Sequence, residues 1–425
     1  MSDDGGTGQD RSLIHRYYLF RVTNTSGFFL PVAIIILQDK EFGMGFVGVA
    51  YAVYAVAKLL LEVPTGYVGD WLGRRGSLAI GSAVRAVVIG VYPFLGSEAL
   101  YLGLHVLWAV GRSFRSGTQD AWLYEILQAR FDESDFARIE SRGNTLKLVT
   151  DAVTAVAGGV LYSMEMAIPF VATAAIALVG IPVLFSFPSI AKLSVDPDDD
   201  RAGEVAGDNE DRGPLTMSLA LRLLRLQLAS PAVRWFMVYG ATFSSLFVVT
   251  RIYEQPALDA VGVPVAGFGV LYAAFKLVSA GVASSVGRVH DAIGTRGVLG
   301  AMIPIYAVAY ASIAIAPVLV VPVLFLNRGL RTMTRPVTNQ YLNERLEDVG
   351  RATVLSGASM FFALVGSAAR LVAGVGTELL GPVGFLPVAG VVLSLLGGVV
   401  WVFTSPVRTA PEPRSDRAGV LSAGD

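Results

Sequence analysis

The stretch at residues 62–78 reads EVPTGYVGDWLGRRGSL and directly follows a long apolar segment. Gly66 and Gly73 allow two helix ends to approach closely and the chain to turn tightly. Asp70 can accept hydrogen bonds from the start of a neighbouring helix, where the helix dipole favours a carboxylate. Arg74 follows four residues later and can pair with a carboxylate on another helix. The stretch therefore predicts a short, charged connection between two long helices.

The composition on both sides of this connection is that of a membrane protein. The chain has 425 residues, of which 53% are hydrophobic and 16% charged, and its mean hydropathy is +0.58. Soluble domains carry about 25% charged residues, so an ordinary core cannot hide this much apolar sequence. Apolar stretches of roughly 20 residues, the length that crosses a bilayer as a helix, alternate with short polar breaks. We predict twelve transmembrane helices, at residues 14–37, 46–67, 78–96, 100–123, 145–162, 168–187, 233–253, 265–286, 298–318, 320–342, 354–376 and 385–403.

The distribution of basic residues predicts how these helices are oriented. Loops on the side of the amino terminus contain Arg74, Arg75, Arg130, Arg138, Arg142, Arg288, Arg296, Arg345 and Arg351. The opposite loops contain little besides Lys40. Because cytoplasmic loops carry an excess of Lys and Arg, we expect a multi-pass protein of the cell membrane with both termini in the cytoplasm. Residues 1–11 are too polar for a cleavable signal peptide, so the first span is expected to insert uncleaved.

A polar segment divides the twelve spans into two groups of six. The acidic run DPDDDRAGEVAGDNED at residues 196–211 is expected to be a solvated linker, and residues 215–228 are expected to form an amphipathic helix on the membrane surface. The predicted organisation is a cytoplasmic tail, a six-helix bundle, a cytoplasmic linker, a second six-helix bundle and a cytoplasmic tail, at residues 1–13, 14–190, 191–232, 233–404 and 405–425.

The two groups of six spans are related by an internal repeat. GYVGDWLGRR, which begins at Gly66, matches GRVHDAIGTR, which begins at Gly287, and YAVAK matches YAAFK just upstream. The offsets between matching residues are nearly constant, at 221 for Asp70 and Asp291, 218 for Lys58 and Lys276, and 219 for Arg112 and Arg331. Six spans separate the repeats, so both begin on the same side of the membrane. Parallel repeats place a substrate path between two halves that can rock against each other.

The connection after the second span resembles the signature loop of the major facilitator superfamily. The resemblance extends over the chain from Ile14 to Phe403, and GRSFRSGTQDAWLYE in the fourth span is similar to the drug-exporter-like branches of that superfamily. It implies an all-α fold of two six-helix parallel repeats in which the loop latches the cytoplasmic side shut in the outward-open state. The alternative is a basic loop that only fixes topology. The expected gating residues are Gly66, Asp70, Gly73, Arg74, Arg75 and the partner carboxylate Glu125, with Asp291 and Arg296 in the second half, where Thr295 replaces the first arginine.

Ionisable residues inside the predicted spans are candidates for the transport path, because charges in a bilayer are costly. The candidates are Lys58, Arg112, Asp120, Lys276, Arg331 and Arg335. We expect the midplane cations to make the central cavity electropositive, which suits an anionic or proton-exchanging cargo. Asp120 can exchange protons or form a static ion pair. Other charges fall at helical spacing and are expected to pair locally, as Lys147 with Asp151 and Arg251 with Glu254.

The sequence thus predicts a secondary active transporter, with proton-coupled efflux of a small molecule as the leading hypothesis. The alternative is a transporter-like membrane sensor or scaffold that binds a ligand without moving it. The chain has no cysteine and only three histidines, and it has no nucleotide-binding GxxxxGK[ST] motif. An enzyme, a cofactor, a metal site and a nucleic-acid partner are therefore not expected. The expected partners are a small-molecule substrate, protons and the lipid bilayer, and the expected state is a monomer.

Overall fold

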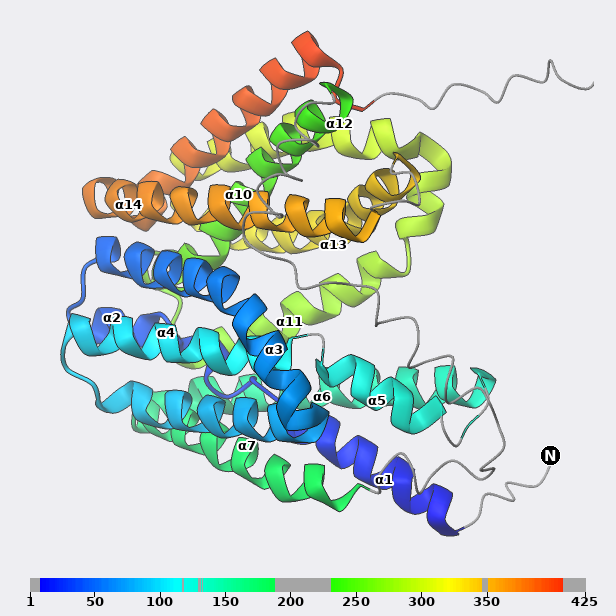
Figure 1. Ribbon diagram of the computed structural model, residues 1–425. Coiled ribbons are helices and arrows are strands. Elements are labelled where there is room, and N and C mark those ends of the chain that lie inside the picture. Colours follow the sequence, from blue (N-terminus) through cyan, green and yellow to red (C-terminus); the bar gives the residue numbers. More distant parts are fainter. Residues whose placement is uncertain are drawn as a thin grey trace, which may run out of the picture.

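The computed structural model describes residues 8–116, 118–128, 131, 133–187, 231–345 and 351–407, and these residues form two helical bundles (Figure 1). The predicted linker and the amphipathic helix at residues 215–228 lie outside the described residues. The first bundle contains α1 (Gly8–Thr23), η1 (Leu30–Val32), α2 (Ile35–Asp39), α3 (Met44–Val91), η2 (Tyr92–Phe94), α4 (Glu98–Arg115), α5 (Thr118–Gln128), α6 (Glu133–Met164) and α7 (Ile168–Ser186). The second bundle contains α10 (Pro231–Ala260), α11 (Val265–Ala283), α12 (Val286–Ile315), η4 (Pro317–Leu319), α13 (Val320–Arg345) and α14 (Arg351–Thr404).

Three of the long helices turn sharply at a glycine. Gly73 in α3, Gly294 in α12 and Gly381 in α14 have φ of 71°, 64° and 69°, each with an extended ψ. A side chain at this backbone conformation would be strained, so glycine is required there. Gly73 and Gly294 occupy matching places in the two sequence repeats, and their matching backbone confirms the repeat.

The twelve predicted spans can be followed through these helices. Eight described stretches are long and apolar enough to cross a membrane, and one of them, Gly357–Thr404, turns at Gly381 and contains the last two spans. The other three spans fall below that criterion for physical reasons. The first is broken between α1 and α2, the fourth is broken between α4 and α5, and α13 carries Arg328, Arg331 and Arg335. The predicted all-α fold of two six-helix repeats is confirmed.

The bundles contact each other chiefly through two helix pairs, α3 with α14 and α6 with α11. A Cβ added to Gly48 of α3 would lie 2.5 Å from the carbonyl oxygen of Arg370, and one added to Gly269 of α11 would lie 2.0 Å from that of Ala155. Only glycine permits these backbones to approach so closely, as is common where membrane helices cross. Both contacts lie away from the turns at Gly73 and Gly294.

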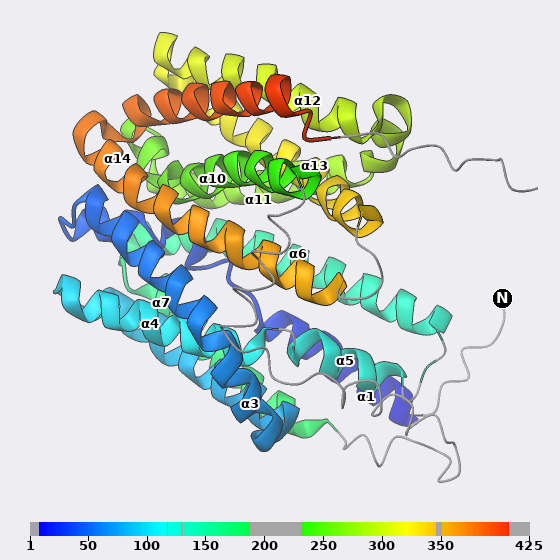
Figure 2. The same ribbon diagram turned by 45° about the horizontal axis from the view of Figure 1, so that its top comes forward.

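The two ends of the molecule therefore differ. We call the end with the starts of α3 and α11 and the turn at Gly381 the sealed end, and the end with the turns at Gly73 and Gly294 the basic end. Figure 1 and Figure 2 show α3 and α14 side by side at the sealed end and diverging toward the basic end. Among the described residues, the close helix contacts between the bundles thus lie toward the sealed end.

Hydrogen bonds between the bundles reinforce the sealed end. The Gly45 N–H donates to Glu378 Oε2 at 2.8 Å, and the Tyr253 hydroxyl donates to the carbonyl of Met44 at 3.2 Å. The Gln255 side chain of α10 accepts from the N–H of Ile34 at 2.8 Å and donates to the carbonyl of Leu30 at 2.8 Å. Gln255 therefore satisfies backbone groups that the break in the first span leaves without helical partners.

Candidate functional site

A cavity of about 380 Å³ lies between the two bundles. The first bundle contributes apolar and aromatic groups to its wall, among them Tyr51, Tyr54 and Trp108. The second bundle contributes polar and charged groups from α10, α13 and α14. The volume is within the range of small-molecule binding sites. The predicted substrate path between the repeats thus coincides with a real hollow.

Four arginines of the second bundle line this cavity: Arg251, Arg328, Arg331 and Arg370. Two of them share one carboxylate, since Arg251 contacts Glu254 and Arg328 Nη2 lies 2.6 Å from Glu254 Oε2. The Tyr272 hydroxyl also donates to Glu254, whose surface is only 1% exposed. The predicted pair of Arg251 and Glu254 is confirmed. One negative charge therefore faces two positive charges here, which leaves a net positive charge.

The other two arginines have no carboxylate beside them among the described residues. The Arg331 guanidinium lies 5.4 Å from the centroid of the Phe247 ring. The Nε and Nη1 of Arg370 are buried without a hydrogen-bond partner in the part of the chain that the structure describes. Unsatisfied buried donors are costly, and guanidinium groups match carboxylate and phosphate oxygens well. The cavity is therefore electropositive and equipped to hold an anion.

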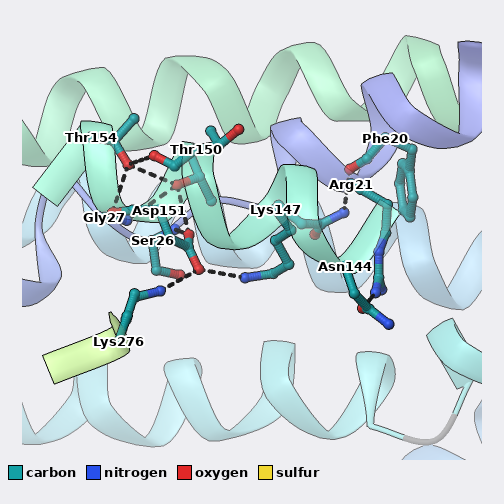
Figure 3. Close-up of polar contacts among 12 residues, drawn as sticks. Phe20, Arg21, Ser26, Gly27, Asn144, Lys147, Thr150, Asp151, Thr154 and Lys276 are labelled. Atoms are coloured by element: carbon teal, nitrogen blue, oxygen red, sulfur yellow. Dashed lines mark hydrogen bonds and ion pairs between the residues drawn. The ribbon is translucent and has the colours of Figure 1, made fainter. Parts of the chain in front are cut away.

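A second buried carboxylate, Asp151 of α6, connects the two bundles (Figure 3). Its Oδ2 accepts from Lys147 at 2.8 Å on the same helix and from Lys276 of α11 at 2.7 Å in the other bundle. Its Oδ1 accepts from the Thr25 hydroxyl at 2.8 Å and the Ser26 N–H at 3.2 Å. The predicted pair of Lys147 and Asp151 is confirmed. Asp151 also ties the broken first span to α6.

The break in the first span is stabilised from α3 as well. Arg85 donates to the carbonyl of Thr25 and, at 3.1 Å, to the hydroxyl of Ser26. Free backbone groups inside a membrane protein need such partners. Figure 3 also shows Arg21 of α1 donating to Asn144 of α6. The unwound segment is thus held in place by charged side chains.

The predicted transport-path residues are distributed differently from the expectation. Arg331 lines the central cavity, and Arg335 lines an adjoining hollow that shares Arg331. Lys58 instead pairs with Glu62 one turn away, and Lys276 pairs with Asp151. Arg112 is exposed and is not among the residues lining the cavity. Lys58, Arg112 and Lys276 therefore do not line this cavity in this conformation, where local or cross-bundle carboxylates hold both lysines, and their role in the transport path stays a prediction. The side chain of Asp120 lies outside the described residues.

Arg328, Arg370 and Gln255 contribute to the site but were not predicted from the sequence. Arg370 is a charge inside the apolar span predicted at residues 354–376. The rule that intramembrane charges are functional candidates applies to it as much as to Arg331. Gln255 gave no such signal, because a neutral amide near a span end is common.

The signature loop makes its described contacts within the first bundle. Arg74 Nη2 lies 2.6 Å from Glu125 Oε1 on α5, which is the partner proposed from the sequence. Arg75 Nη2 donates to the carbonyl of Phe187 at 2.7 Å. Gly73 makes the predicted turn, whereas a Cβ on Gly66 would meet nothing within 4 Å. The close approach expected at Gly66 is therefore absent from this conformation.

The remaining gating residues do not define a latch in this conformation. Asp291 and Arg296 are exposed on α12. The side chain of Asp70 lies outside the described residues. The gating role of these residues stays a prediction.

Two facing helical bundles with a substrate-sized cavity between them are the architecture of secondary transporters of the alternating-access type. The family model described as Major Facilitator Superfamily matches residues 18–369, and the chain belongs to that superfamily. It is therefore a multi-pass membrane protein of a transporter superfamily. A curated relative, the uncharacterized MFS-type transporter YxaM of Bacillus subtilis (strain 168), is 24% identical over 251 residues. That match spans 58% of each chain.

Solved structures of other transporters share the fold. A mutant form of the nucleoside transporter NupG superposes with a TM-score of 0.73 at 12% identity, covering 93% of this chain and 100% of that one. A bacterial homologue of the human lysosomal transporter Spinster, in an inward-facing and occupied conformation, gives 0.66 at 14% identity, with 94% and 98% covered. A bacterial homologue of the iron transporter ferroportin, in an inward-facing state, gives 0.63 at 14% identity, with 93% and 98% covered. At these identities the likeness establishes the architecture alone.

Proposed function

We propose that the chain transports a small anionic molecule that binds in the arginine-lined cavity between the bundles. The observation that carries this proposal is the excess of cations over carboxylates around the cavity. Arg370 in particular presents buried donors that no described group satisfies. A carboxylate, sulfonate or phosphate group would supply the missing acceptors and offset the charge. A static sensor would also bind such an anion, so transport itself has to be measured.

The proposed orientation places the basic end in the cytoplasm and the protein in the cell membrane. The excess of arginine on that side supports it. In this orientation the bundles, as far as the structure describes them, diverge toward the cytoplasm. Binding of the anion would draw the bundles together at the basic end and release the hydrogen bonds at the sealed end. The latch role of the signature loop belongs to that second state.

We also propose that transport is outward and coupled to protons, as the likeness to drug-exporter-like branches suggests. Asp151 supports this mode, because its carboxylate holds a lysine of the other bundle. Protonation of Asp151 would remove the charge that attracts Lys276 and would weaken a bond between the halves. A carboxylate whose protonation changes the stability of one state relative to the other can couple protons to the transport cycle.

A paired-ligand screen tests the anionic-substrate proposal. Carboxylates, sulfonates and phosphate esters are each compared with a neutral amide or alcohol analogue, using thermal stabilisation of the purified protein. We expect the stabilising compounds to be anions. The affinity of the best anion should fall about 10- to 150-fold in Arg370→Gln, the range expected for one lost charged hydrogen bond.

The matched control for this variant is Arg288→Gln. Arg288 is an exposed arginine on α12 that lies outside the cavity. Its replacement makes the same change in net charge and should leave anion affinity unchanged. Equal stabilisation by the neutral analogues, or equal losses in both variants, would contradict an anion site at Arg370.

A further inference from the structure

The second bundle contains another hollow, of about 230 Å³, beside the central cavity. We call it the side pocket. Its wall includes the aromatic residues Tyr239, Phe243, Phe247 and Phe362, together with Arg331 and Arg335. Phe247 and Arg331 also line the central cavity. The two hollows are therefore neighbours that share one wall.

The aromatic wall of the side pocket is fixed in place. The ring centroids of Phe243 and Tyr239 are 5.0 Å apart, and those of Phe243 and Tyr306 are 5.8 Å apart in a stacked arrangement. The Tyr239 hydroxyl already donates to the carbonyl of Leu299. Tyr239 thus offers its ring and not its hydroxyl to the pocket. A rigid aromatic wall of this kind favours a flat apolar group, because aromatic rings pack edge to face or offset against one another.

Arg331 stands at the junction of the two hollows. Its guanidinium lies 5.4 Å from the Phe247 centroid, so the cation and the shared ring are in contact. Arg335 follows one turn later on α13 and lines the side pocket but not the central cavity. An acidic group held by Arg370 and Arg331 in the central cavity would have the aromatic wall directly next to it. The arrangement fits a molecule with one charged end and one flat apolar end.

We infer that the substrate is an aromatic anion, whose acidic group binds the cavity arginines and whose ring system occupies the side pocket. This inference rests on the proposed function and narrows its substrate class. A small hydrophilic anion would leave the aromatic pocket empty and would gain nothing from it. A neutral aromatic compound would fill the pocket but leave the Arg370 donors unsatisfied.

Titration calorimetry on the purified protein tests the inference with three probes. Naphthalene-2-sulfonate carries both groups, methanesulfonate carries the anion alone, and naphthalene-2-sulfonamide carries the ring system with a neutral end. The aromatic anion should bind more tightly than either of the others by about tenfold or more, because only it uses both hollows. No binding of naphthalene-2-sulfonate to the wild-type protein would overturn the inference.

A plugged variant makes the test specific to the side pocket. Ser244 of α10 lines that pocket but not the central cavity, so Ser244→Leu fills it with an isobutyl group. Affinity for naphthalene-2-sulfonate should fall about tenfold or more, and affinity for methanesulfonate should not change. Ser312→Leu on α12 makes the same replacement outside both hollows and should bind all probes as the wild type does. Thermal unfolding of both variants checks that they are folded.

The outcomes separate the inference from the proposed function. Unchanged naphthalene-2-sulfonate affinity in Ser244→Leu, combined with a loss in Arg370→Gln, would contradict binding of the ring system in the side pocket. The anion site at Arg370 would still be supported. A loss in Ser244→Leu with no change in Arg370→Gln, and with equal binding of the sulfonamide, would overturn the anion site. We expect both variants to lose affinity for naphthalene-2-sulfonate. Of the two, only Ser244→Leu should retain binding of methanesulfonate.

Discussion

Asp151 and Glu254 are both buried carboxylates, and each holds two cations. Glu254 binds Arg251 and Arg328, which all belong to the second bundle. Asp151 binds Lys147 of its own helix and Lys276 of the opposite bundle. The Glu254 group can therefore move as one unit when the bundles rock. The Asp151 group has to change if α6 and α11 separate.

This difference suggests separate tasks for the two carboxylates. A rigid cluster of arginines around Glu254 keeps the cavity arginines in a fixed geometry through the cycle, which favours binding. A bond between bundles instead contributes free energy to one state and not to the other. Lysine suits the second task, since its flexible ammonium can exchange one partner for another more easily than a planar guanidinium can. The predictions below test this division, from the largest expected effect to the smallest.

Glu254→Gln should have the largest effect on stability. The substitution leaves Arg251 and Arg328 without their carboxylate in the protein interior, which typically costs about 3–5 kcal/mol. Asp151→Asn should cost less, because the flexible ammonium groups of Lys147 and Lys276 can turn to other partners more easily than the planar guanidinium groups of Arg251 and Arg328 can. Thermal unfolding of the purified variants measures both losses of stability. Equal losses would mean that the two clusters are equivalent.

Lys276→Gln should shift the equilibrium between states more than Lys147→Gln does, although both lysines bind the same oxygen of Asp151. Only Lys276 crosses to the other bundle. A lost charged hydrogen bond of about 1.5–3 kcal/mol would change the population ratio roughly 10- to 150-fold. Spin labels on Ala99→Cys and Ala260→Cys, both exposed at the sealed end, report the separation of the bundles.

The chain contains no native cysteine, so the labels attach only where they are introduced. In Lys276→Gln the distance distribution should gain a population at longer distances. In Lys147→Gln it should resemble that of the wild type. The same shift in both variants would show that Asp151 acts by local packing and not as a bond between the bundles.

Arg74→Gln should have the smallest effect on stability. Arg74 and Glu125 lie within one bundle, and their side chains are 41% and 21% exposed. Ion pairs with this exposure contribute about 0.2–1 kcal/mol. A melting temperature close to that of the wild type is therefore expected, with Arg296→Gln as the control in the second repeat. A loss of stability as large as that of Glu254→Gln would mean that this ion pair stabilises the fold much more than its exposure indicates.

The fold followed from the sequence because it depends on local and periodic signals. Span lengths and the turn at Gly73 are encoded within short windows, and the repeat is recognised from short motifs at a nearly constant offset. The same holds for the pairs of Lys147 with Asp151 and Arg251 with Glu254, whose helical spacing brings them together. The pair of Arg74 and Glu125 could be proposed because both residues stand at helix ends on one side of the membrane.

The candidate site was less predictable because it depends on how helices rotate and which bundles touch. Lys276 and Asp151 are far apart in the sequence and belong to different bundles, so no spacing rule connects them. For the same reason the sequence did not distinguish Arg331, which faces the cavity, from Arg112, its counterpart in the first repeat. Repeated positions share a backbone environment, but the two bundles present different faces to the cavity.

The central claim, that the arginine-lined cavity is the transport site, is tested most directly by the rate of anion uptake into proteoliposomes. The best anion from the paired screen is measured with the wild type, Arg370→Gln and Arg288→Gln. Arg370→Gln should lose most of the transport rate and keep its thermal stability, because the Nε and Nη1 of Arg370 are buried donors without a described partner. Arg288→Gln should transport as the wild type does. Equal transport by Arg370→Gln and the wild type would contradict the claim.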